Sequence, residues 1–167
     1  MRVRSGTAVK ALALAFGITA AAILPATAQP AVSGRATVID GDTIEIRGTR
    51  IRLHGVDAPE LSQTCRRTNR RDWDCGVEAA VALDSFVGGR TVRCQPNGDV
   101  HGNRIIAVCF KGAEDINRWL VANGWAVASR RFSEAYVPDE DQARAARRGL
   151  WSGPFVMPWD YRNGQRR

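Results

Sequence analysis

The residues that could do chemistry in this chain are gathered in two short loops. The first loop is Asp40-Gly41-Asp42-Thr43, the second is Asp57-Ala58-Pro59-Glu60, and Arg52 lies on the stretch between them. Oxygen ligands can hold a hard divalent cation, and a remaining carboxylate can activate a water molecule. A guanidinium can bind a phosphate through two parallel hydrogen bonds. Together these groups could cleave a phosphodiester bond.

Each motif taken alone also has a plain structural explanation. Asp-Gly between apolar runs is a common hairpin turn, and a lone arginine on a strand usually faces solvent. An EF-hand loop needs a glutamate at its twelfth position, which is an isoleucine counted from Asp40 and a leucine counted from Asp42. That motif is therefore excluded, and the combination of loops and arginine favours a catalytic site.

The first 28 residues have the pattern of a secretory signal peptide. Arg2, Arg4 and Lys10 precede an apolar run over residues 11–24, which is too short for a stable membrane span, and Ala26-Thr27-Ala28 follows. We expect cleavage near Ala28 and a secreted or periplasmic protein with no membrane span in its mature part.

Charge permits a nucleic-acid partner without requiring one. The chain has a formal net charge of +7, and without the three basic residues of the first 28 it is +4. A basic domain attracts polyanions, but a GC-rich genome that supplies arginine in place of lysine would give the same balance. Residues 29–167 suit a single domain, which we expect to be a monomer, with a core over 34–151 and an aromatic tail over 152–167.

Four cysteines in an exported chain indicate disulfide bonds, for which three pairings are possible. A zinc site is not expected, because no C-x-x-C pair occurs and the chain has two histidines. We favour Cys65–Cys75, which would close a polar loop, and Cys94–Cys109, which would join neighbouring strands.

The pattern of elements predicts an α+β fold. Stretches rich in β-branched residues predict five strands, at 35–40, 42–47, 50–56, 91–95 and 104–110. Helical spacing predicts about three helices, the first over 78–87, the second ending at Asn123 and the third from near Pro138 to near Arg148. The last two strands would be joined through residues 96–103. This order suggests a five-stranded OB-type β-barrel with helices inserted between and after its strands.

The two loops and Arg52 resemble the thermonuclease (staphylococcal nuclease-like) family. The motifs that carry the resemblance are Val38-Ile39-Asp40-Gly41-Asp42-Thr43 and Arg52-Leu53-His54-Gly55-Val56-Asp57-Ala58-Pro59-Glu60. The similarity extends from about Gly34 to Trp151. It implies an OB-barrel nuclease that uses Ca²⁺ to hydrolyse DNA, RNA or both.

The resemblance also implies a metal site. Asp42, Asp57 and the backbone carbonyl of Ala58 would bind the cation. We expect Asp40 to support these ligands from behind, as outer carboxylates often do.

The same resemblance makes Glu60 the general base and gives Arg52 and a later arginine the role of stabilising a phosphorane-like transition state. The family usually has Gly-Arg before an apolar strand, whereas here Asn103 separates Gly102 from Arg104. We assign the role to Arg104, which still directly precedes the strand. The extra residue either lengthens the turn harmlessly or displaces the guanidinium, and a displacement of about 1 Å can cost on the order of a hundredfold in rate.

The substrate side of the site departs from the family. Where the type member has tyrosines, this chain has Ser129-Arg130-Arg131-Phe132. Base stacking could fall to Phe132 or His101, and Arg130 and Arg131 could hold backbone phosphates. The alternative function is a non-catalytic nucleic-acid-binding module on the same barrel, which would predict a broken set of carboxylates or arginines.

Overall fold

The computed structural model describes residues 29–166. The predicted signal peptide, residues 1–28, and its cleavage near Ala28 lie outside the described residues. Among residues 29–166, no helix has the length and apolar character needed to cross a membrane.

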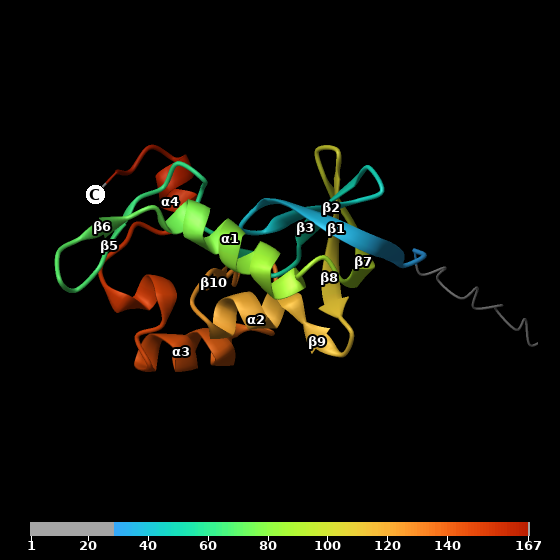
Figure 1. Ribbon diagram of the computed structural model, residues 1–167. Coiled ribbons are helices and arrows are strands. Elements are labelled where there is room, and N and C mark those ends of the chain that lie inside the picture. Colours follow the sequence, from blue (N-terminus) through green and yellow to red (C-terminus); the bar gives the residue numbers. More distant parts are fainter. Residues whose placement is uncertain (1–28, 167) are drawn as a thin grey trace, which may run out of the picture.

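Five strands close into a barrel (Figure 1). Its members are β1 (Val32–Asp40), β2 (Thr43–Ile46), β3 (Thr49–Leu53), β7 (Thr91–His101) and β8 (Arg104–Lys111). The first three form an antiparallel meander, and β7 pairs antiparallel with both β1 and β8. A parallel pairing of β3 with β8 completes the ring, with Ile51 opposite Ile105. The predicted OB-type barrel is confirmed.

The remainder of the described chain forms four helices and several short strands. The helices are α1 (Cys75–Val87), α2 (Ile116–Ala122), α3 (Val137–Ala145) and α4 (Pro158–Arg162), with a 3₁₀ turn at Gly149–Ser152. The short strands are β4 (Val56–Asp57), β5 (Cys65–Arg66), β6 (Asp72–Trp73), β9 (Glu114–Asp115) and β10 (Val127–Ala128). The three predicted helices are present, the first starting three residues earlier than expected. Helix α4, in the aromatic tail, was not predicted.

The core lies between the barrel and helices α1 and α2. Ile44, Ile51 and Leu53 from the barrel are buried together with Leu83 of α1 and Leu120 of α2. These positions recur every second residue on the strands, which is the alternation that a sheet with one buried face requires.

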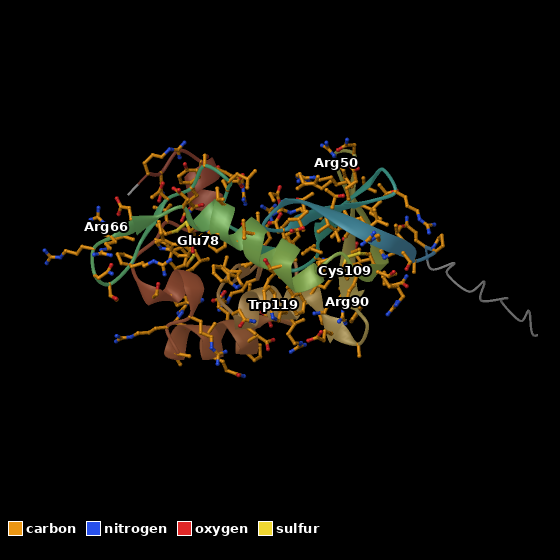
Figure 2. The ribbon with its side chains drawn as sticks, in the orientation of Figure 1. Arg50, Arg66, Glu78, Arg90, Cys109 and Trp119 are labelled. Carbon is orange, nitrogen blue, oxygen red and sulfur yellow. A yellow bond between two sulfur atoms is a disulfide. The ribbon has the colours of Figure 1, made fainter. Side chains whose placement is uncertain are left out.

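Helices α1 and α2 contact each other through aromatic rings. Phe86 of α1 stacks on Trp119 of α2, with ring centroids 4.0 Å apart, and Figure 2 shows Trp119 between the two helices. Trp119 is partly buried and packs against the core cluster.

The prediction that residues 96–103 form a loop between the last two barrel strands is wrong. Strand β7 continues to His101, where it pairs with Arg104, and the chain reverses at Gly102-Asn103. The sequence Pro96-Asn97-Gly98 looks like a turn, but the structure accommodates it as an irregularity within β7. Asn103 therefore occupies the hairpin turn, beside a glycine with a φ of +63°, and Arg104 stays in register on β8.

Both disulfide bonds form as predicted, Cys65–Cys75 and Cys94–Cys109. The second joins paired residues of β7 and β8 and is fully buried in the barrel. It therefore cross-links the hairpin that carries Arg104.

Replacing both Cys94 and Cys109 with alanine should lower the free energy of unfolding by about 3 kcal/mol, because the unfolded chain regains the freedom of a 15-residue loop. Urea denaturation measures this loss. An unchanged urea midpoint in the double alanine variant would show that the hairpin does not need the cross-link for its stability. The double alanine variant of Cys65 and Cys75 serves as the matched control, because it removes the other disulfide and leaves Cys94–Cys109 in place.

Candidate active site

The two acidic loops lie against each other. The Asp42 carbonyl accepts a hydrogen bond from the Leu53 amide at 2.8 Å, and Asp42 Oδ2 accepts one from the Ala58 amide at 3.0 Å. Gly41 allows this approach, since a Cβ there would lie 2.6 Å from Ala58 Cβ. The consequence is that Asp42 and Asp57 are both buried in one place, with exposures of 4% and 3%.

Arg52, on β3, bridges these two acids. Its Nη2 atom lies 2.9 Å from Asp42 Oδ2 and 2.9 Å from Asp57 Oδ1. The neighbouring side chains Ile51 and Leu53 point into the core, so the alternation of β3 directs Arg52 to the opposite face.

The electrostatics of the site centre on Asp42. Burial raises the pKa of Asp42 to about 7; Arg52 and the Ala58 amide act against this rise, whereas the charges of Asp40 and Asp57 add to it. Asp40 Oδ1 also accepts a hydrogen bond from the Asp42 amide at 3.0 Å. Asp40 thus contacts the backbone of Asp42 and borders the same pocket.

Glu60 lies on a loop whose backbone is tightly held. The Gln63 amide donates to the Glu60 carbonyl at 2.7 Å, and the Gly76 amide donates to the Gln63 carbonyl at 3.3 Å. Gly76 lies so close to the Glu60 carbonyl that a Cβ on Gly76 would overlap it. The start of α1 therefore fixes the position of the loop backbone. The Glu60 side chain itself remains 40% exposed.

A pocket of about 1130 Å³ gathers the predicted residues. Its lining includes Asp40, Asp42, Arg52, Asp57, Ala58, Glu60, His101, Arg104, Arg130, Arg131 and Phe132. Every residue that the sequence assigned to metal, catalysis or substrate therefore borders one cavity.

Not all of these side chains engage the acids. The Arg104 guanidinium lies 2.6 Å from His101 Nδ1, across the hairpin turn, and borders the pocket. Arg130 pairs with Glu140 at 2.8 Å, and the latter is 1% exposed, so that guanidinium already neutralises a buried acid. Arg131 lies over the ring of Phe132, which is 65% exposed and can offer a face to a base.

Sequence reasoning missed Arg162. This residue of α4 pairs with Asp57 at 2.7 Å and with Glu60 at 2.7 Å, although 102 residues separate it from Glu60. Hydrogen bonding to Asp57, reinforced by Glu60, raises the pKa of Arg162 above its ordinary value. Arg162 belongs to the predicted aromatic tail, residues 152–167, in which no local pattern indicated which residues would reach the pocket.

The donors at the centre of the site are all oxygens, which suits a hard cation. Within residues 29–166 no three acidic, histidine or cysteine side chains converge to hold a metal ion. A cation could be held by Asp42 and Asp57 together with the Ala58 carbonyl, with water as the remaining ligands. The raised pKa of Asp42 fits this use, because a divalent cation would supply the positive charge that the buried carboxylate needs.

Comparison with known proteins adds an independent result. A family model described as "Staphylococcal nuclease homologue" matches residues 50–153. The chain is 39% identical over 142 residues to the succinoglycan biosynthesis protein ExoI of Rhizobium meliloti, covering 81% of this chain and 74% of that protein. It is 31% identical over 134 residues to an uncharacterized endonuclease of Escherichia coli O157:H7, covering 75% and 81%. A probable staphylococcal-like nuclease of Oryza sativa subsp. japonica is 31% identical over 128 residues, which span 32% of that protein.

Replacing Gly76 with alanine should lower the free energy of unfolding by about 1–3 kcal/mol, because the added methyl group overlaps the Glu60 carbonyl. Val77→Ala is the control on the same helix, since Val77 is 45% exposed and should change stability by less than about 0.5 kcal/mol. Urea denaturation compares the two. Equal free energies of unfolding for the two variants would show that the Glu60 loop can move aside for the methyl group without loss of stability.

The raised pKa of Asp42 predicts the sign of a pH effect on stability. In the folded protein the carboxyl keeps its proton up to about pH 7, whereas in the unfolded chain it loses it near 3.9. With chelator present, ionisation of Asp42 should therefore lower stability as pH rises from about 4 to 7. Urea denaturation across this pH range compares the wild type with Asp42→Asn. In that variant the fall in stability that is due to Asp42 should be absent. The same slope in both proteins would contradict the assignment.

Proposed function

This chain belongs to the family of staphylococcal nuclease homologues, which supports nuclease activity, and we propose that it hydrolyses phosphodiester bonds of DNA, RNA or both in a Ca²⁺-dependent reaction. The observation that carries the proposal is the convergence of Asp42, Asp57, Glu60 and Arg52 in one pocket. The intact carboxylates and arginines favour an enzyme over a binding module on the same barrel.

Asp42, Asp57 and the Ala58 carbonyl would hold the cation. Bound there, Ca²⁺ would draw charge from a phosphate oxygen and lower the barrier to attack on phosphorus. Asp40 would keep Asp42 in place through the hydrogen bond to its amide.

Glu60 would take the proton of the attacking water. Its exposed carboxylate faces the pocket from the loop that follows the metal ligands. A carboxylate is a weak base, so proton removal alone cannot account for a fast reaction. Much of the acceleration must come from stabilisation of charge in the transition state.

Arg52 and Arg104 would supply that stabilisation. Arg52 now spans Asp42 and Asp57, so a cation that neutralised these acids would free the guanidinium for phosphate. Arg104 borders the same pocket from β8 and does not share in that acid pairing. Two planar guanidiniums can each contact two oxygens of the phosphate.

Phe132 and Arg131 would contact the substrate outside the reacting centre. The exposed ring can stack on a base, and the neighbouring guanidinium can hold a backbone phosphate. His101 and Arg130 would add to this surface less directly, since Arg104 and Glu140 already engage them.

The protein would act outside the cytoplasm. This part of the proposal rests on the signal-like N-terminal sequence and is supported by two disulfide bonds, which persist in oxidising compartments. We propose that it is secreted or periplasmic and acts as a monomer.

Incubating the oxidised protein with plasmid DNA tests the proposal. Cleavage with Ca²⁺ and none with chelator is the expected result. Retention of DNA without cleavage in either condition would instead identify a binding module, and neither cleavage nor retention would remove nucleic acid as the ligand. RNA in parallel reactions assigns the preferred polymer.

Glu60→Gln should lower kcat by about a hundredfold or more, because an amide cannot accept the proton of water. The fold should survive, since the Glu60 side chain lies on the surface of the pocket. Val77→Ala is again the control, and thermal unfolding verifies that both variants are folded. Turnover like that of the wild type would exclude Glu60 from proton transfer.

A further inference from the structure

We propose that Arg162, on helix α4, is a positioning residue that orients the Glu60 carboxylate, an inference that rests on the proposed function. Nη1 donates to Glu60 Oε1 at 2.7 Å. The same guanidinium donates from Nη1 and Nη2 to the two carboxylate oxygens of Asp57, at 3.0 and 2.7 Å. The family match ends at residue 153, so Arg162 lies beyond it.

The geometry of these bonds suits orientation. Two parallel bonds to Asp57 set the plane of the guanidinium, because a planar fork on a buried carboxylate has little rotational freedom. The Arg162 Nη1 atom that donates to Glu60 is therefore held in a fixed position. This bond uses one carboxylate oxygen and leaves the second to accept a proton from water.

Glu60 needs such a partner. Its side chain is 40% exposed, and an exposed glutamate pays a large part of its rotamer entropy to hold one conformation. The backbone of its loop is fixed by Gly76 and Gln63, but these contacts stop at the main chain. Arg162 extends that order to the carboxylate itself.

The segment that carries Arg162, residues 154–165, is tied to the same loop as Glu60. The Gln63 side-chain amide donates to the Val156 carbonyl at 2.7 Å, and the Tyr161 hydroxyl donates to the Ser62 carbonyl at 2.8 Å. Gln63 is 1% exposed, and Pro158 at the start of α4 is buried. These ties make α4 a built part of the site, which favours positioning over a flap that blocks it. Figure 1 shows α4 beside the start of α1, the element whose Gly76 lies against the Glu60 carbonyl.

A charge argument separates positioning from metal binding. Arg162 is a cation in contact with Asp57, a proposed metal ligand, so it repels a second cation. Removing its charge should leave Ca²⁺ affinity unchanged or increase it. A loss of turnover without a loss of Ca²⁺ affinity is therefore the signature of a role exerted through Glu60.

The test compares Arg162→Gln and Arg162→Lys with the wild type. Arg166→Gln is the matched control, because Arg166 directly follows this segment and bonds to the main-chain carbonyls of Tyr161 and Gln165 and to neither Asp57 nor Glu60. Calorimetry with Ca²⁺ gives the metal affinity, and cleavage of a single-stranded DNA oligonucleotide at saturating Ca²⁺ gives kcat and KM. Arg162→Gln should lose about tenfold to a hundredfold in kcat, with KM within about threefold. Arg162→Lys should recover part of the loss, and Arg166→Gln should behave as the wild type.

Three results would overturn the inference. Turnover of Arg162→Gln at or above the wild-type value would make Arg162 neutral or inhibitory. Weaker Ca²⁺ binding by this variant would place its effect on the metal ligand. A wild-type protein that cleaves no DNA would remove the proposed function and this inference with it. A wild-type protein that cleaves DNA, together with an Arg162→Gln variant of equal turnover, would remove the inference alone.

A second variant keeps the test open should Arg162→Gln not fold, as judged by thermal unfolding. Tyr161→Phe removes the hydroxyl that ties α4 to Ser62 and retains Arg162. It should lower kcat in the same pattern by a smaller factor, with Ca²⁺ affinity unchanged. Full turnover in this variant would show that the position of α4 does not matter to Glu60.

Discussion

The burial of Asp42 and Asp57 side by side is the constraint on which the rest of the site depends. Two carboxylates of like charge, removed from water, are stable together only if positive groups and amide donors face them. The chain meets this need with Arg52 between the acids, the Ala58 amide on Asp42 and Arg162 on Asp57. Asp42 nevertheless keeps a raised pKa, so the neutralisation is incomplete. A site with this residual demand for positive charge is suited to a divalent cation.

The barrel enforces that burial through a pairing of segments distant in sequence. Strand β3 carries Arg52, and its parallel pairing with β8 brings Arg52 opposite Ile106, two residues from Arg104. The Asp42 loop follows β1, and the Asp57 loop begins at the end of β4, shortly after β3, so closing the ring puts the loops and both arginines on one side. The Cys94–Cys109 bond joins β7 to β8 at the same hairpin. Core packing and site geometry therefore share the same strands.

Much of this arrangement was predictable, because its causes are local. Alternation on β3 fixes the direction of Arg52, and cysteines on neighbouring strands limit the sensible pairings. The extent of β7 was not predictable, because Pro96-Asn97-Gly98 has the composition of a turn and becomes a strand irregularity only when β8 pairs with both flanks. The partner of Arg130 was hidden for a similar reason. Glu140 looks like an ordinary acid in the first turn of α3, and its burial depends on how α3 packs.

The arginines around the pocket divide into two groups by what their guanidiniums touch. Those of Arg52 and Arg162 contact the central acids, and that of Arg130 contacts the buried Glu140. Those of Arg104 and Arg131 contact a histidine and an aromatic ring, neither of which carries a negative charge. A guanidinium without an acid partner retains its full attraction for an anion. Attraction of a polyanion to the pocket must therefore begin on the side of β8 and residues 131–132. Under the proposed mechanism, Arg52 would join once a cation had taken over Asp42 and Asp57, whereas Arg162 would stay on Glu60.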